Sequence, residues 1–277
     1  MTTTTAGRGK REGGRVPRWL HVLAALWRLN VAEELQYRAN FFASVLGTVF
    51  GIGTALLTLA VFFRHTTRLG GWDYWEVVVL LGVFNALTGV IEAVLRPGIG
   101  QLAGEVRSGQ LDLVLSRPVD AQAFVSFRRL DIWRLTDVAL GLGLAAYALH
   151  RLGHVPSALE LAAFGVAFAS AAVVVYAIWV VLMSLAFWLV AVENLSVLFD
   201  ALYEGARYPV SAYPGVLRFV FVYLVPIAWT TTIPASALTG RLGPGIGLVA
   251  AAVAIAAFAL ARWLWQRALK RYTGASG

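Results

Sequence analysis

The feature that most constrains this chain is a series of long apolar segments separated by short polar ones. The first runs from Phe41 to Phe63. As a helix, about 22 residues rising 1.5 Å each cross a bilayer hydrocarbon core of about 30 Å. The whole chain is 59% hydrophobic and 14% charged, whereas soluble domains average about 45–50% and about 25%. The sequence therefore predicts an all-α integral membrane protein, because only helices or closed barrels satisfy their backbone hydrogen bonds in lipid.

The apolar pattern predicts six transmembrane helices within one membrane domain, residues 41–272. Expected spans are about 41–63, 74–95, 131–149, 158–182, 185–208 and 244–265. The run from Ala158 to Val192 is too long for one untilted span. Either one span ends near Val192 and a cytoplasmic linker follows, or two spans meet near residues 182–185. Three acids outweigh Arg207 in the supposed linker, a poor composition for the cytoplasmic side, which favours two spans.

Three segments around the spans have their own character. Residues 1–17 form a polar, Thr- and Gly-rich arm that is expected to be disordered. Residues 18–40 mix Trp and Leu with charges, which predicts a helix lying on the membrane surface or packed on the protein itself. Residues 216–229 are apolar and bracketed by prolines, which predicts a re-entrant or surface hairpin on the outer side.

Basic residues predict the orientation in the membrane. Seventeen of the 23 Lys and Arg residues lie in the N-terminal 40 residues, in the Arg96–Arg134 region and in the C-terminal segment from Arg262 onward. The six others lie on the opposite face. Cytoplasmic loops carry the excess of positive charge, so both termini and the loop 98–130 are expected in the cytoplasm.

That loop contains the most distinctive polar stretch, Glu105–Pro118. Its charged residues could make charge-assisted hydrogen bonds to a partner, and Leu111, Val114 and Leu115 form an apolar stripe at helical spacing. The candidate docking residues are Glu105, Arg107, Gly109, Leu111, Asp112, Leu115, Arg117 and Pro118. A docking surface and a short helix resting on the bilayer are equally compatible with these residues.

Polar side chains within the predicted spans are a second group of candidates. They are Asn85, Glu92, Glu193, Asp200 and Glu204, with Asp137 as a further acid. Acids are costly to place in a membrane and are functional candidates by default, as proton carriers or cavity-lining groups. The alternative is that they lie at helix ends or pair with arginines such as Arg134 or Arg207.

Several classes of site are disfavoured. The sequence has no cysteine, which excludes thiolate chemistry and Cys-ligated metals. Lys10 and Lys270 are each followed by Arg, so no P-loop is present. His150 and His154 flank a Gly-containing turn and are interpreted as loop residues. No catalytic, cofactor or metal site and no nucleic-acid surface is expected.

The sequence Glu105-Val106-Arg107-Ser108-Gly109-Gln110-Leu111-Asp112, with Leu115-Ser116-Arg117-Pro118, resembles the loop between spans two and three of type-two ATP-binding-cassette (ABC) transporter permeases. The likeness is strongest to the daunorubicin-resistance-like branch of bacterial permeases. The later pattern Arg207-Tyr208-Pro209, Tyr213-Pro214, Pro226 and Pro234-Ala235 is similar to that branch's outer loop. The resemblance covers roughly Leu35 to Tyr272.

This resemblance implies a transport machine with separate subunits. Glu105–Pro118 would be a coupling helix seated in a cleft of a P-loop ATPase, and residues 18–40 would be an interfacial connecting helix. Two permeases, identical or homologous, would pair with two ATPases that hold ATP and Mg, so the chain itself would not be an enzyme. It would export an amphiphilic, drug-like or lipid-like substrate across a bacterial inner membrane. A proton-coupled secondary transporter that uses the intramembrane acids is the alternative.

Overall fold

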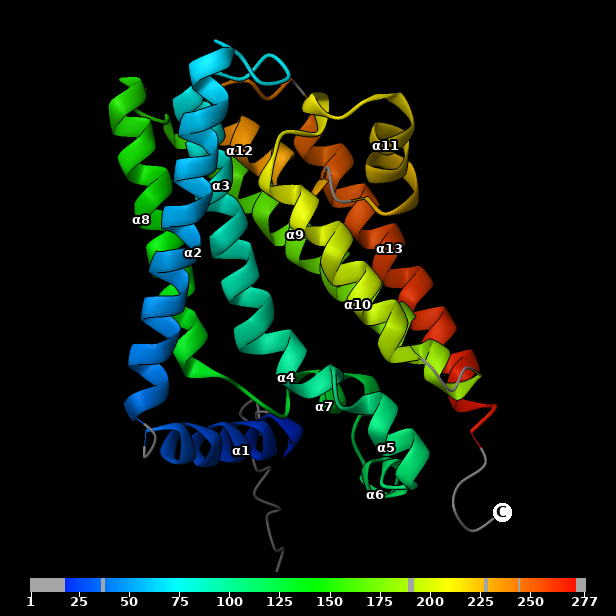
Figure 1. The fold of residues 1–277 in the computed structure, drawn as a ribbon. Helices are drawn as coiled ribbons and strands as arrows, with labels where there is room; N and C mark the ends of the chain where they lie inside the picture. The colour runs from blue at the N-terminus through cyan, green and yellow to red at the C-terminus, as the bar shows by residue number, and fades with distance from the viewer. Residues whose placement is uncertain (1–17, 36–37, 189–191, 227–228, 244, 273–277) are drawn as a thin grey trace, which may run out of the picture.

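The computed structural model describes residues 18–35, 38–188, 192–226, 229–243 and 245–272, which form a bundle of helices (Figure 1). The predicted polar arm, residues 1–17, lies outside the described residues. Five described helical segments are long and apolar enough to cross a membrane: Ala39–His65, Tyr74–Ser108, Ile132–Leu152, Ala158–Phe187 and Ile246–Leu269. They contain the helices α2 (Arg38–His65), α3 (Tyr74–Val90), α8 (Leu135–Leu152), α9 (Ala158–Ser184) and α13 (Ile246–Leu269). The chain is thus a multi-pass helical membrane protein.

The second membrane helix is longer than the sequence predicted. The predicted span ends at residue 95, but the helical segment includes Arg96-Pro97-Gly98 and extends to Ser108. It passes through a π-helical turn η1 (Ile91–Leu95), α4 (Arg96–Ile99) and α5 (Leu102–Ser108). Pro97 occupies the first turn of α4, where its missing N–H group removes no helical hydrogen bond. The proline therefore starts a new turn and does not stop the helix.

The predicted fifth span, residues 185–208, is not among the five long apolar helical segments. A 3-10 turn η3 (Leu185–Phe187) ends α9, and α10 (Val192–Tyr203) lies beside α9, followed by η4 (Glu204–Arg207) (Figure 1). The turn η3 falls within the predicted span, just after the boundary expected at residues 182–185. α10 has 12 residues and η4 continues it for four more. A count of six spans therefore remains a prediction.

One end of the molecule gathers the loops that were predicted to be extracellular. They include η5 (Val210–Ala212), α11 (Gly215–Phe219), the π-helical turn η6 (Val220–Leu224) and α12 (Thr232–Leu238), at the top of Figure 1. Ser211 Oγ donates a hydrogen bond to the Gly70 carbonyl at 2.6 Å. Arg241 pairs with Glu76 and donates to the Gly71 carbonyl. Hydrogen bonds thus join loops that lie far apart in sequence.

The opposite end carries the segments predicted to be cytoplasmic. Helix α1 (Arg18–Glu34) lies crosswise to α2 there, near α6 (Leu111–Leu115) and α7 (Ala121–Phe127) (Figure 1). Trp27 Nε1 donates to the Phe127 carbonyl and Asn30 Nδ2 to the Arg128 carbonyl at 3.1 Å. α1 is thus bound to the protein, and its Leu29, which is 68% exposed, lines a groove together with α6. A position of α1 on the membrane surface stays a prediction.

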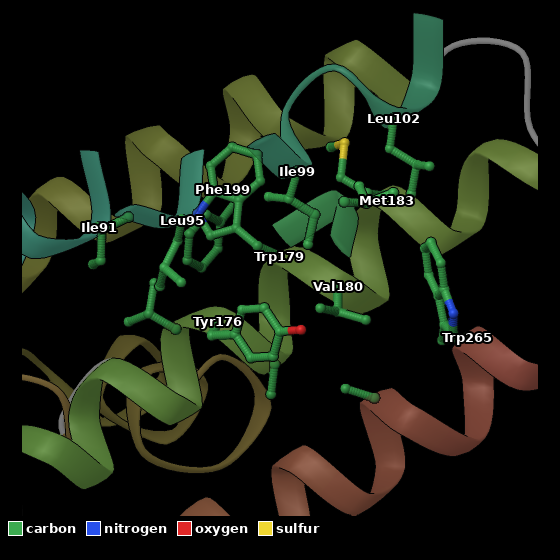
Figure 2. Packing of buried hydrophobic residues seen from close by; sticks show 14 of the residues in the cluster. Ile91, Leu95, Ile99, Leu102, Tyr176, Trp179, Val180, Met183, Phe199 and Trp265 are labelled. Atoms are coloured by element: carbon green, nitrogen blue, oxygen red, sulfur yellow. The ribbon is translucent and has the colours of Figure 1, made fainter. Parts of the chain in front are cut away.

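A hydrophobic cluster supports the base of the second membrane helix. Figure 2 shows residues of η1, α4 and α5 packed against α9, α10 and α13; they include Ile91, Leu95, Ile99, Leu102, Tyr176, Trp179, Val180, Met183, Phe199 and Trp265. Ile99 and Leu102 are almost fully buried. In a membrane such side chains stabilise helix contacts by close packing, because lipid tails are as apolar as the side chains themselves. The cluster therefore holds α5 rigidly against the membrane helices.

Candidate docking site at the end of the second membrane helix

Helices α5, α6 and α7 form a compact unit at the predicted cytoplasmic end. Gly109 ends α5 with φ of 74°, a left-handed conformation that glycine adopts without a steric penalty. Asp120 starts α7, because its side chain accepts a hydrogen bond from the Ala123 amide at 2.9 Å. These two residues fix the reversals on either side of α6, so its orientation is determined by local sequence.

Glu105 has an internal partner. Its carboxylate pairs with the Arg128 guanidinium, and the two side chains are only 13% and 14% exposed. The pair links α5 to the end of α7. Glu105 also lines a groove beside α5, so its predicted contact with another protein stays a prediction.

The apolar stripe faces the opposite way from the one expected for docking. Leu111 is fully buried and Val114 is 5% exposed, so both pack within this chain. Leu115 is 39% exposed, and Leu113, which the helical stripe omitted, is 68% exposed. The stripe correctly marked one face of α6 as apolar. It could not tell that Leu111 and Val114 on this face are buried within the chain.

The charged candidates lie around the exposed side of the unit. Arg107 is exposed in the last turn of α5, and Pro118 is exposed after α6. The Arg117 guanidinium lies 4.8 Å from the centroid of the Phe124 ring. Burial raises the pKa of Tyr272, and the negative charge of the nearby Asp112 raises it further. Asp112 therefore lies near Tyr272, just after α13.

A groove of about 520 Å³ runs beside α5. Its walls include Arg107, Ser108 and Gln110, and its floor includes Trp179 and Met183 of α9. An apolar floor with a polar rim is the usual composition of a protein docking surface.

The polar residues of the membrane segments are mostly paired. Arg96 forms ion pairs with Glu92 at 2.5 Å and with Asp200 at 2.6 Å, and its guanidinium lies 5.2 Å from the Trp179 ring centroid. Glu204 pairs with Arg207 at 2.6 Å. The side chain of Glu193 lies outside the described part of the structure. Glu92, Asp200 and Glu204 are thus each paired with an arginine.

Asn85 and Asp137 line a cavity of about 630 Å³ between α2, α3 and α8. Asn85 Nδ2 donates to the Leu81 carbonyl at 2.8 Å. Asp137 accepts a hydrogen bond from Thr48 and lies 3.6 Å from Arg134. Asn85 and Asp137 contribute to the polar lining of this cavity. Both side chains keep hydrogen-bond partners, as buried polar groups must.

The sequence did not predict a second polar connection, which joins α13 to α7. Arg262 of α13 donates to both carboxylate oxygens of Asp120 and to Gln122 Oε1, and Gln122 Nε2 donates to the Tyr176 hydroxyl at 3.0 Å. Partial burial alone would raise the pKa of Asp120, but hydrogen bonds from Arg262 and from the Ala123 amide outweigh it and lower that pKa. About 140 residues separate the partners, so no local pattern could reveal the contact.

The fold and this polar end define a multi-pass helical membrane protein with a compact helical unit at one end of its membrane helices. The family model described as "ABC-2 family transporter protein" matches residues 49–276. The chain therefore belongs to the ABC-2 transporter family, whose members are ABC transporter permeases, and this membership implies partnership with an ABC ATPase. No curated protein and no solved structure matches the chain.

Proposed function

We propose that this chain is the membrane subunit of an ABC exporter and that a separate ATPase docks on the α5–α6 unit. One observation carries the proposal. The segment Tyr74–Ser108 is helical over most of its 35 residues, and it runs from the buried core of the bundle to α6, where Leu113 is exposed. A nearly continuous helix with a rigid base can pass a displacement at its end to the membrane region.

The contacts suggest how the displacement spreads. ATP and Mg bound by the ATPase would favour one arrangement of its subunits, which is a two-state equilibrium biased by a ligand. The Glu105–Arg128 pair makes α5 and α7 move together. Arg96 connects the same helix to Asp200 of α10. The second span would thus move with α10 as well as with its close neighbour α8.

The remaining parts of the proposal concern assembly and cargo. Two copies of the permease, identical or homologous, would pair with two P-loop ATPases in a bacterial inner membrane, with both termini in the cytoplasm. Membership in the ABC-2 family supports the ATPase partnership. The cargo would be an amphiphilic, drug-like or lipid-like molecule, in keeping with apolar membrane helices, and it would move outward.

The docking surface is tested by co-purification with ABC ATPases of the same cell, beginning with any encoded in a neighbouring reading frame. Leu113→Asp and Arg117→Glu should each lower ATPase recovery about tenfold, because an exposed apolar anchor or a charge contact is lost. Lys270→Glu is the matched control: it reverses an exposed charge at the same end of the molecule. Thermal unfolding should be unchanged in all three variants. Equal ATPase recovery from Leu113→Asp and from the control would contradict the proposal.

A proton-coupled secondary transporter remains the alternative proposal. The pairing of Glu92, Asp200 and Glu204 with arginines argues against it, since an adjacent positive charge favours the ionised carboxylate. Liposomes that contain only this chain would separate the two proposals. Transport driven by a pH gradient alone would support the alternative and exclude the ATPase-dependent exporter.

A further inference from the structure

A second groove, of about 520 Å³, lies between three membrane helices and α7. Val90 and Val94 line it from α3 and η1, Ala172 and Val173 from α9, and Phe258 from α13. Asp120 and Arg262 also line it. Its volume falls within the range of about 300–1,000 Å³ typical of small-molecule sites. The docking unit α5–α6 does not contribute to it.

The lining changes from polar to apolar along the helices that form it. On α13, Arg262 lies one helical turn beyond Phe258, and on α9 Tyr176 lies one turn beyond Ala172. Along both helix axes the polar lining is therefore about 6 Å closer than the apolar lining to the end predicted to be cytoplasmic.

The polar end carries two opposite charges side by side. The Arg262 and Asp120 side chains are 36% and 44% exposed, so both remain accessible at the groove mouth. The three hydrogen bonds that Arg262 makes to Asp120 and Gln122 use at most three of its five N–H groups. Asp120 accepts hydrogen bonds from the Ala123 amide and twice from Arg262, which leaves about one of its roughly four lone-pair sites for a ligand. Phe258 is 43% exposed at a depth where the surroundings are apolar.

We propose that this groove binds a membrane phospholipid of the inner leaflet, with a primary-amine zwitterionic headgroup at Asp120 and Arg262 and an acyl chain along the apolar wall. The phosphate accepts hydrogen bonds from Arg262 and the ammonium donates to Asp120. Phosphatidylethanolamine meets both requirements. Phosphatidylcholine has no N–H donor, and phosphatidylglycerol has no cation for Asp120. This inference is independent of ATPase docking.

The acyl-chain position is tested with phosphatidylethanolamine that carries a photoreactive group in its chain, using the purified protein in nanodiscs. Peptides containing Val173 and Phe258 should be labelled. Val173→Trp fills the groove and should lower that labelling about fivefold. Val166→Trp is the matched control: it is on the same helix, 48% exposed, and lines a different groove at the other end of α9. Its labelling should equal that of the unmodified protein.

The headgroup position is tested by comparing lipid retention in phosphatidylethanolamine, phosphatidylcholine and phosphatidylglycerol, measured by native mass spectrometry. The expected preference for phosphatidylethanolamine is about tenfold, as for the loss of one or two charge-assisted hydrogen bonds. The double variant Asp120→Asn/Arg262→Gln should remove it. The control Arg68→Gln/Asp73→Asn neutralises an exposed ion pair at the other end of the molecule and should keep it.

Three results would overturn the proposal. One is labelling that Val173→Trp does not reduce. Another is equal retention of the three lipids by the unmodified protein. The third is cross-linking from the groove to a second copy of the chain, which would make this surface a subunit interface. Photolabelling of the Val173→Trp protein tests the proposal even if the double variant Asp120→Asn/Arg262→Gln fails to fold.

Discussion

At the scale of single residues, the surroundings of a charged side chain decide whether it is buried in an ion pair or exposed. Glu105 and Arg107 stand two positions apart in one exposed-looking stretch of sequence, yet Glu105 is buried in a pair with Arg128 while Arg107 is exposed. A buried charge without its partner is strongly unfavourable, because its lost hydration is not compensated. The Glu105–Arg128 pair is therefore expected to govern the stability of the α5–α7 unit.

Replacing Arg128 by Gln should destabilise the protein by about 3 kcal/mol, since it leaves Glu105 charged and unpaired. The double variant Glu105→Gln/Arg128→Gln should recover most of that loss. Arg129→Gln, at the adjacent exposed position, should change the unfolding free energy by less than about 0.5 kcal/mol. Unfolding in detergent measures all three. The interpretation fails if Arg128→Gln and Arg129→Gln behave alike.

At the scale of elements, α3 and α8 pack at glycines. A Cβ atom at Gly82 or at Gly141 would lie 2.6 Å from backbone atoms of the facing helix. Small residues that let helices approach closely are a principal means of packing in membranes. The sequence Gly141-Leu142-Gly143 could superficially suggest the start of a nucleotide-binding motif, but its first glycine is a helix contact.

Gly141→Ala should therefore force α3 and α8 apart and cost about 1–3 kcal/mol of stability. Gly143→Ala lies on the same helix, and a Cβ there meets no atom within 4 Å. It should be neutral or stabilising by up to about 1 kcal/mol, because alanine favours the helix. Thermal unfolding of the two variants in the same detergent provides the comparison. A Gly141→Ala protein as stable as Gly143→Ala would show that this contact is not close.

At the scale of the whole molecule, the loops separate into two ends. The turn around Val155, together with the hydrogen-bonded loops near Gly70 and Ser211, belongs to the end that has few Lys and Arg residues. The α5–α7 unit, α1 and the end of α13 form the other (Figure 1). The distribution of Lys and Arg in sequence thus agrees with the separation of the loops in space.

Because the chain has no cysteine, single cysteines can report its orientation. Val155, which is 89% exposed, should react as Val155→Cys with a membrane-impermeant maleimide in intact cells. Ser116→Cys, at an exposed position after α6, should react only after the membrane is permeabilised. Both proteins should be labelled equally in detergent, which controls for thiol reactivity. The reverse pattern would invert the proposed orientation and place the docking unit outside the cell.

The sequence by itself determined that this is a helical membrane protein with an unusual loop after its second span, because hydrophobicity and span length are local properties. Only the tertiary structure decided that the second helix continues through Pro97, that Leu111 and Val114 face inward, and that Arg262 meets Asp120. Each of these depends on which surfaces meet in space, and helical periodicity marks an apolar face without stating what covers it.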